Sequence, residues 1–206
     1  MKSSNNNKTL GAVIVCAGKG ERTGLPYNKV LHVLGNKTVL ERVLDTFCEC
    51  GFSRIAVVAS ADDISRITEI VSEYMRNGVD TAVTLGGNTR AESVRNGLKA
   101  CPCDIVAIHD GARPYATKEL VLRTIESAKR YGSGVAAVRS VDTVKRRTAD
   151  GKVQSLPRNE LFNMQTPQTF AYADIVSAYS VAPDTVTDDA EAFELWGGDT
   201  VLVDGY

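Results

Sequence analysis

The feature that most constrains the fold of this chain is the alternation of short apolar segments with longer segments of helical periodicity. Strand-like segments lie at residues 10–16, 53–60, 79–85, 104–110 and 133–141. Helical segments lie between them, at residues 38–50, 61–75, 90–100 and 117–131. Such alternation favours right-handed crossovers and a mostly parallel sheet. We therefore predict an α/β fold, a Rossmann-like three-layer sandwich, in which the continuously apolar run 10–16 is a strand covered on both faces.

Several helix signals support this assignment. Thr38 and Glu41 have the spacing of a capping box, and Gly51 is expected to end the helix that they begin. The next helical segment places four apolar or aromatic side chains on one face: Ile64, Ile67, Val71 and Tyr74.

The alternation is interrupted at residues 141–158, which read as two short strands around an Asp150–Gly151 turn. A hairpin inserted into an α/β series often projects from the body, so we predict a protruding β-arm here. Alternation returns in residues 172–205. We expect one domain over residues 1–206, with a polar, disordered N-terminus at residues 1–9.

Composition excludes several classes of protein. The 206 residues are enough for one domain with its own core. The net charge of −1 argues against a partner that is a nucleic acid or a membrane surface. No stretch approaches the ~20 apolar residues of a membrane span, and the polar N-terminus lacks the apolar core of a signal peptide. We expect a cytoplasmic location.

The cysteines also favour a cytoplasmic location. Their odd number and the absence of a secretion signal favour reduced thiols. The C-x-C spacing of two pairs is shorter than that of usual zinc sites, so metal binding is the less favoured alternative. The five residues are Cys16, Cys48, Cys50, Cys101 and Cys103.

A glycine-rich loop follows the first predicted strand, at the carboxyl end where open α/β sheets bind ligands. Glycines let the main chain approach a ligand, and successive N–H groups can hold an anion. The loop also carries Lys19, Arg22 and Lys29, which suit a ligand with several negative charges, such as a triphosphate with its metal. The alternative is that the glycines only form turns and the lysines only contact solvent.

Two common nucleotide motifs do not match this loop. In the dinucleotide fingerprint that begins at Gly18, Thr23 takes the place of the third glycine. The acid expected about 20 residues later should end a strand, whereas Glu41 lies in a predicted helix. The Gly-Lys-Ser/Thr of a Walker loop is also absent. A nucleotide-dependent oxidoreductase is therefore a less favoured alternative.

Four further blocks accompany the loop, at residues 85–98, 108–115, 158–170 and 186–194. Together they resemble the 2-C-methyl-D-erythritol 4-phosphate cytidylyltransferase family. The resemblance implies a nucleotide-diphospho-sugar transferase-like fold. It also implies CMP transfer from CTP to 2-C-methyl-D-erythritol 4-phosphate, which yields 4-diphosphocytidyl-2-C-methyl-D-erythritol and pyrophosphate in non-mevalonate isoprenoid synthesis. The related ribitol-5-phosphate cytidylyltransferase shares most blocks and stays open as an alternative.

The resemblance implies roles for individual residues in nucleotide binding. Arg22 and Lys29 would be catalytic, because they would neutralise the triphosphate as charge builds on its oxygens. Carbonyl groups of the glycine turn would accept from the 4-amino group of cytosine, and Ser93 would bond the base. Arg90 would brace this loop. The implied nucleotide-binding residues are Ala17, Gly18, Lys19, Gly20, Gly86, Gly87, Asn88, Arg90, Ser93 and Arg113.

The resemblance also implies contacts with a sugar-alcohol phosphate and a homodimer. The arm of each subunit would reach the partner's site, where Arg158 would be catalytic by clamping the attacking phosphate. An arm with little core of its own independently favours a partner, although its charge run could simply be solvated. The implied substrate-binding residues are Asp110, Thr143, Lys145, Arg158 and Thr166. His109 is expected to be structural, since this reaction needs no strong base.

Magnesium is the implied cofactor, held mainly through the phosphates of CTP, because Mg²⁺ commonly uses one or two carboxylates plus substrate phosphates. Asp110 and Asp189 are candidate ligands. The alternative for Asp188 or Asp189 is that either one caps the helix that follows.

Three departures from the family pattern are visible. Asn28 precedes Lys29 where the family usually has proline, and Asn88 replaces a frequent aspartate. The family continues beyond the position of Tyr206 with a further lysine that binds triphosphate. A nucleotide-binding relative without turnover therefore stays open as a third alternative.

Overall fold

A computed structural model describes residues 8–18, 26–76 and 78–206. The strands of its central sheet are β1 (Leu10–Val15), β4 (Arg54–Ala59), β5 (Thr81–Leu85), β6 (Ile105–Asp110), β7 (Ser133–Arg139), β10 (Phe162–Ala171) and β11 (Leu202–Asp204). Among the described residues the sheet has seven strands in the order β11-β7-β10-β6-β1-β4-β5. Neighbouring strands are parallel except where β10 pairs with β6 and β7. The predicted mostly parallel sheet is confirmed.

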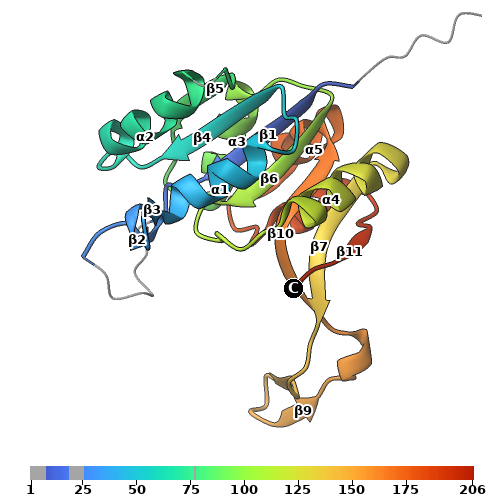
Figure 1. The fold of residues 1–206 in the computed structure, drawn as a ribbon. Coiled ribbons are helices and arrows are strands. Elements are labelled where there is room, and N and C mark those ends of the chain that lie inside the picture. The colour runs from blue at the N-terminus through green and yellow to red at the C-terminus, as the bar shows by residue number, and fades with distance from the viewer. Residues whose placement is uncertain (1–7, 19–25, 77) are drawn as a thin grey trace, which may run out of the picture.

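Helices cover both faces of this sheet (Figure 1). They are α1 (Val39–Cys48), α2 (Ile64–Arg76), α3 (Arg90–Ala100), α4 (Lys118–Tyr131), α5 (Tyr172–Val181) and α6 (Asp189–Trp196). Ala12 and Ile14 of β1 belong to a buried cluster with side chains of α1, α2 and α4. Val13 belongs to a second cluster with side chains of α3, α5 and α6. Because β1 is buried on both faces, as its apolar run predicts, the three-layer sandwich is confirmed.

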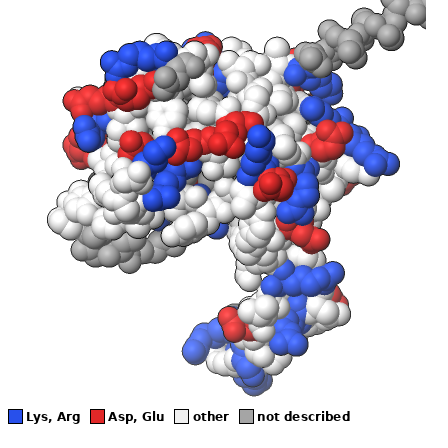
Figure 2. Space-filling view, in the orientation of Figure 1, with Lys and Arg blue, Asp and Glu red and all other residues white. Residues whose placement is uncertain are grey.

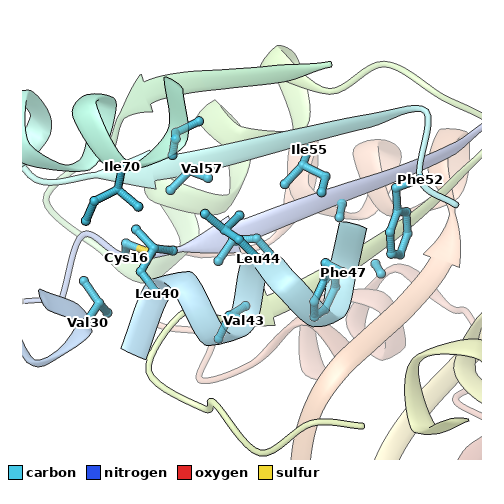
Figure 3. Close-up of a cluster of buried hydrophobic side chains, with 14 of the residues drawn as sticks. Cys16, Val30, Leu40, Val43, Leu44, Phe47, Phe52, Ile55, Val57 and Ile70 are labelled. Atoms are coloured by element: carbon cyan, nitrogen blue, oxygen red, sulfur yellow. The ribbon is translucent and has the colours of Figure 1, made fainter. Parts of the chain in front are cut away.

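Figure 3 shows part of the first cluster, in which α1 lies across the sheet. Phe47 stacks on Phe52 with ring centroids 5.5 Å apart. Cys16, Val30 and Leu40 belong to the same cluster and lie at the other end of α1 (Figure 3). The core therefore extends to the segment that follows the glycine-rich loop.

The helix signals in the sequence are also confirmed. Glu41 N–H donates to Thr38 Oγ1 at 3.2 Å, and Thr38 N–H donates to Glu41 Oε2 at 2.6 Å, so the capping box is formed. Gly51 follows the helix with a φ of 76°, a conformation that favours glycine. The predicted face of α2 packs on the core. Since Glu41 serves this cap, it is not placed as a ribose-binding acid.

Strand β10 is the strand of the central sheet that the sequence analysis did not assign. Pro167 lies inside it, and proline normally interrupts a strand ladder. The register of β10 with β7 shifts between Met164 and Gln168, and this irregularity accommodates Pro167. The strand runs antiparallel beside β6, which brings Thr166 next to the end of that strand.

The predicted arm projects from the end of β7 (Figure 1). It contains β8 (Lys145–Arg147) and β9 (Val153–Ser155), which pair antiparallel, and is followed by the 3-10 helix η3 (Arg158–Glu160). Residues 148–152 form the connection, a longer loop than the two-residue turn expected at Asp150–Gly151. All residues of both arm strands are exposed, so the arm contributes nothing to the core.

Two terminal and connecting segments complete the description. The 3-10 helix η2 (Lys29–Leu31) leads into a small hairpin of β2 (Val33–Leu34) and β3 (Lys37–Thr38). Residues 1–7 of the predicted disordered N-terminus lie outside the described residues, but the prediction is wrong for Thr9, whose N–H and hydroxyl both donate to Asp104 Oδ2 at 2.7 Å. Within the described ranges, no helix has the length and apolarity needed to cross a membrane.

Candidate active site

A pocket of about 320 Å³ opens at the carboxyl ends of β1 and β6. Pairing of these strands places Val15 opposite Asp110, so the loops that follow them emerge side by side. This is where open α/β sheets bind ligands. The pocket is lined by Val15, Cys16, Gly18, Asn28, Lys29, Val30, Asp110, Ala112 and Arg113.

The pocket brings together both ends of the predicted phosphate loop. Gly18, near the start of this loop, and Lys29, which follows the loop in η2, both line the pocket, and Lys29 is partly buried. Lys19, Gly20 and Arg22 lie outside the described residues. Beneath the loop, burial and then the nearby carboxylates of Asp110 and Asp63 raise the pKa of the Cys16 thiol, which therefore stays neutral.

A chain of hydrogen bonds fixes the loop that carries Asp110 and Arg113. His109 Nε2 lies 3.1 Å from the Arg113 carbonyl oxygen and can only donate to it, so Nδ1 accepts from Thr166 Oγ1 at 3.0 Å. Thr166 Oγ1 in turn accepts from the Asp110 N–H at 3.2 Å. Burial lowers the pKa of His109 to about 4, so the neutral imidazole that this pattern requires is present at neutral pH.

These bonds decide two residue predictions. His109 is buried and hydrogen-bonded at both ring nitrogens, which agrees with the structural role expected for it. Thr166 is also buried, and its hydroxyl is engaged on both sides by the protein. The structure thus gives Thr166 a role in holding the Asp110 loop, and does not present it openly to a substrate.

Asp110 has one engaged and one available carboxylate oxygen. Its Oδ2 accepts from Arg113 Nε at 3.0 Å. Its Oδ1 lies 3.8 Å from Arg90 Nη2 and has no hydrogen bond from the described residues. The side chain is 32% exposed and the residue lines the pocket, so its carboxylate is accessible to a substrate hydroxyl or to a metal ion bound by phosphates.

The turn between β5 and α3 is closely packed and depends on its glycines. A β-carbon at Gly86 would lie 2.8 Å from Ser93 Oγ, and one at Gly87 would lie 2.2 Å from the β-carbon of Glu92. Buried Ser93 accepts from the Gly87 N–H at 3.1 Å and donates to the Thr89 carbonyl at 2.9 Å. Its donor is thus used in shaping the turn and is not left for the predicted bond to a base.

Ala17 and Asn88 contribute to this turn in different ways. A β-carbon on Gly86 would lie only 2.5 Å from that of Ala17, so the end of β1 packs directly against the turn. The N–H of Asn88 donates to Glu92 at 2.6 Å, and the residue is exposed. The Asn88 side chain therefore stands at the surface of the predicted base-binding loop.

Arg90 and Asp189 form an ion pair that joins the beginnings of α3 and α6. Arg90 Nη1 and Nη2 donate to the two carboxylate oxygens at 2.9 and 2.7 Å, and the Tyr179 hydroxyl donates to Asp189 Oδ1 at 2.5 Å. Burial disfavours the charge of Arg90, but Asp189 outweighs it and raises the pKa of the guanidinium. Burial, followed by the Asp189 charge, raises the pKa of Tyr179.

This ion pair corrects the metal prediction for Asp189. Its side chain is 0% exposed, and both oxygens are engaged, so it does not fit a Mg²⁺ ligand. Arg90 braces the loop, as one of the two roles considered for it required. Asp188 caps α6, because its Oδ1 accepts from the Glu191 N–H at 2.8 Å.

The arm residues are exposed and separate from the pocket lining of the same chain. Thr143, Lys145 and Arg158 are all at the surface, and none belongs to the residues that line the pocket. Arg158 Nη1 donates to the Val141 carbonyl at 3.1 Å and so braces the base of the arm. Figure 2 shows Lys and Arg side chains gathered on the arm.

Of the two predicted magnesium ligands, Asp110 keeps a carboxylate oxygen that has no hydrogen bond from the described residues, whereas Asp189 does not. Within the described ranges, no group of three or more His, Cys, Asp or Glu side chains could hold a metal ion. Asp110 nevertheless lines the pocket and keeps Oδ1 without a hydrogen bond from the described residues, and one carboxylate beside substrate phosphates is an arrangement that Mg²⁺ accepts.

Sequence analysis missed two residues beneath the pocket. Asn28 was noted only as a departure, yet it is buried and lines the pocket. Asp63 was read as part of a helix, yet its carboxylate accepts from Asn28 Nδ2 at 2.9 Å. The position of Asp63 just after the strand 53–60, at the carboxyl edge of the sheet, was the signal that could have identified it.

Comparison with known proteins identifies the family. The family model described as 2-C-methyl-D-erythritol 4-phosphate cytidylyltransferase matches residues 10–206. The chain belongs to this family. Cytidylyltransferases are nucleotidyltransferases, so the chain is an enzyme of this class, as its resemblance to the family predicted.

Individual members of the cytidylyltransferase family agree with this assignment. The 2-C-methyl-D-erythritol 4-phosphate cytidylyltransferase of Dehalococcoides mccartyi is 41% identical over 191 residues, which cover 91% of this chain and 83% of the relative. The enzyme of the same name from Clostridium acetobutylicum is 36% identical, and the match covers 94% of this chain and 87% of the relative. The solved structure of 4-diphosphocytidyl-2C-methyl-D-erythritol synthase from Anaerococcus prevotii matches this chain with a TM-score of 0.85 and 32% identity. The match covers 97% of this chain and 90% of that one.

Proposed function

We propose that this chain transfers CMP from CTP to 2-C-methyl-D-erythritol 4-phosphate, yielding 4-diphosphocytidyl-2-C-methyl-D-erythritol and pyrophosphate in non-mevalonate isoprenoid synthesis. The observation that carries the proposal is the meeting of Lys29, Asp110 and Arg113 in one pocket at the carboxyl ends of β1 and β6, in a member of the cytidylyltransferase family.

The reaction requires little covalent chemistry from the protein. An oxygen of the substrate phosphate forms a bond to the α-phosphorus of CTP, and the bond from that phosphorus to the bridging oxygen breaks, so pyrophosphate leaves with the electron pair. Catalysis then depends on positioning and charge neutralisation. Lys29 supplies a cation at the pocket, and its interaction strengthens as negative charge builds on the phosphoryl oxygens. Arg22 would add a second cation.

Base recognition fits the turn between β5 and α3. Its glycines allow the main chain to pack closely against Ala17, Ser93 and Glu92, which fixes the backbone groups of the turn on which the pyrimidine would lie. A carbonyl there can accept from the 4-amino group of cytosine, which uracil lacks. Asn88 offers both a donor and an acceptor beside it.

Mg²⁺ would supply further neutralisation of the triphosphate when it is bound. Asp110 is the described residue that would contact the metal or the hydroxyl groups of the sugar alcohol, through the Oδ1 that has no hydrogen bond from the described residues. Arg113 holds the other oxygen of Asp110 at 3.0 Å and so limits the orientation of the carboxylate.

A homodimer and a cytoplasmic location are part of the same proposal. The arm exposes Val141 at 79% and Val153 at 57%, so a second subunit would bury apolar side chains that the body does not cover. Thr143, Lys145 and Arg158 would then reach the substrate phosphate in the partner's pocket. The five cysteines are free thiols in the structure, which suits a reducing compartment.

The proposal is tested by pyrophosphate release in the presence of Mg²⁺, with CTP, UTP, ATP and GTP each paired with a set of sugar-alcohol phosphates. We expect turnover with CTP and 2-C-methyl-D-erythritol 4-phosphate. Preferential turnover of ribitol 5-phosphate would replace the proposed substrate by the related one. CTP binding without pyrophosphate release from any pair would overturn the catalytic proposal.

A further inference from the structure

Asn28, the residue before Lys29, is 6% exposed and uses its whole side-chain amide inside the protein. Its Nδ2 donates to the Cys16 carbonyl at 2.8 Å and to Asp63 Oδ2 at 2.9 Å. Its Oδ1 accepts from the Val30 N–H at 3.2 Å. Both amide hydrogens and the amide oxygen are therefore satisfied, which buried polar groups require.

The acceptor Asp63 is itself held in place. Ser60 Oγ donates to Asp63 Oδ2 at 2.6 Å, and the Asp63 N–H donates back to Ser60 Oγ at 3.2 Å. The Asp63 carbonyl accepts from the Ile67 N–H at 2.9 Å, so Asp63 stands at the start of α2. A carboxylate is favoured there by the helix dipole. Asn28 thus ties the end of the glycine-rich loop to both β1 and the β4–α2 connection.

The residue on the other side of Lys29 is equally fixed. Val30 is 2% exposed and lies in the core cluster with Cys16 and Leu40 (Figure 3). The Asn28 carbonyl accepts from the Leu31 N–H at 3.0 Å, which closes the turn of η2. The backbone of Lys29 is therefore held between two buried neighbours, while its side chain lines the pocket.

We infer that Asn28 and Asp63 are positioning residues that hold Lys29 at the triphosphate site, an inference that rests on the proposed function. The backbone of Asn28 has φ −62° and ψ 123°, a conformation that proline also adopts. In this chain three side-chain hydrogen bonds hold that backbone shape. These bonds add links to β1 and α2 that a proline ring cannot make.

The test compares steady-state kinetics of Asn28→Ala, Asn28→Asp and the double variant Asn28→Asp/Asp63→Asn. We expect Asn28→Ala to lower kcat by ~10- to 100-fold, because small displacements of a positioned group cost rates of this order. The KM for the sugar phosphate should change little. Asn28→Asp should lose more, since it places two carboxylates together. Adding Asp63→Asn reverses the donor and acceptor of the bond between positions 28 and 63 and removes one of the two carboxylates. It does not restore the bond to the Cys16 carbonyl, so only about tenfold of that loss should be recovered.

This recovery separates positioning from general destabilisation. The control is Thr38→Ala, which removes the cap of α1 and lowers the melting temperature without touching the pocket. Its kcat should stay near that of the unmodified protein. Asn28→Ala with kcat within about twofold of the unmodified protein, or a double variant no better than Asn28→Asp, would overturn the inference.

Hydrogen exchange of the Val30 and Leu31 amides gives a readout that does not need turnover. Loss of the Asn28 side chain should speed exchange of the Val30 amide by about tenfold or more. Unchanged exchange would show that the side-chain hydrogen bonds of Asn28 do not order the Lys29 turn and would overturn the inference. Absence of turnover in the unmodified protein would instead overturn the proposed function, and hydrogen exchange would still decide whether Asn28 orders this turn.

Discussion

Lys29 lines the pocket, and it is the one of the three cations predicted in the glycine-rich loop that lies within the described residues. It gives the most direct prediction at the scale of one residue. Lys29→Ala should lower kcat/KM for CTP by ~10²- to 10³-fold, the scale of removing one group that stabilises transition-state charge. The melting temperature should change little, because the side chain is only partly buried. Steady-state kinetics and thermal unfolding measure the two effects.

Lys29→Arg is the matched variant, because it keeps the charge but changes its geometry. Its activity should fall between those of the unmodified protein and Lys29→Ala. Normal turnover by Lys29→Ala would show that the pocket at the ends of β1 and β6 is not the triphosphate site.

His109 predicts a pH dependence of folding. Its pKa is lowered by burial to about 4 in the folded protein and lies near 6.5 in an unfolded chain. Between these values the unfolded chain binds more protons, so the free energy of unfolding should rise with pH and reach its full value above about 6.5. As pH falls toward 4, about 3 kcal/mol of stability should be lost through this group.

Urea unfolding at intervals between pH 4 and pH 7.5 measures this dependence. His109→Gln does not titrate, so its stability should fall less steeply over the same range, with the slope differing by up to about 1.4 kcal/mol per pH unit. Parallel curves for the two proteins would mean that the protonation of His109 is not linked to folding.

The limits of sequence reading at this scale follow from where partners lie. The placement of Lys29 and Asp110 at the pocket could be predicted, because the segments that carry them follow β1 and β6 at the ligand-binding edge of the sheet. Asn28 and Thr166 could not, because their partners Asp63 and His109 are 35 and 57 residues away. Sequence alone does not show that these side chains are saturated within the protein.

At the scale of elements, the ion pair of Arg90 and Asp189 links α3 to α6. Asp189→Ala should destabilise the fold by ~3–5 kcal/mol, because it leaves a largely buried guanidinium without its partner. Replacing both, as Arg90→Met/Asp189→Ala, should cost less than the sum of the single variants Arg90→Met and Asp189→Ala. Denaturant unfolding of the four proteins of this double-mutant cycle measures the difference.

The result also checks the correction of Asp189. If Asp189 serves packing and not magnesium, the metal dependence of the remaining activity of Asp189→Asn should match that of the unmodified protein. Additive stability effects in the cycle, or a large rise in the Mg²⁺ concentration needed for activity, would contradict the structural role.

The sheet itself was largely predictable, since β1, β4, β5 and β6 are apolar runs separated by amphipathic helices. Their parallel pairing was expected from the helical crossovers between them, whereas their order in the sheet was not predicted. Strand β10 was not predictable in the same way. Pro167 and the polar residues around it hide its period, and the strand is specified by pairing with β6 and β7 on both sides.

At the scale of the whole molecule, the arm is the feature that one subunit does not explain. Its strands are wholly exposed, and Lys145, Arg146 and Arg147 place three cations in succession on it. Neither property stabilises an isolated chain. Both are understandable if the arm lies on a second subunit and presents positive charge to a phosphorylated substrate.

Mixing two damaged proteins tests this arrangement. Lys29→Ala damages the pocket of its own body, whereas Arg158→Ala damages only the arm. If each arm serves the partner, a mixed dimer has one site in which the body keeps Lys29 and the arm keeps Arg158. With random exchange of subunits about half of the dimers are mixed, so about a quarter of the normal activity should return.

The measurement is pyrophosphate release at low sugar-phosphate concentration, after the two variants are unfolded and refolded together. The same variants refolded separately and then combined are the control. If each arm serves its own body, one site of every mixed dimer lacks the lysine and the other lacks the arginine, and activity should not exceed the average of the two variants.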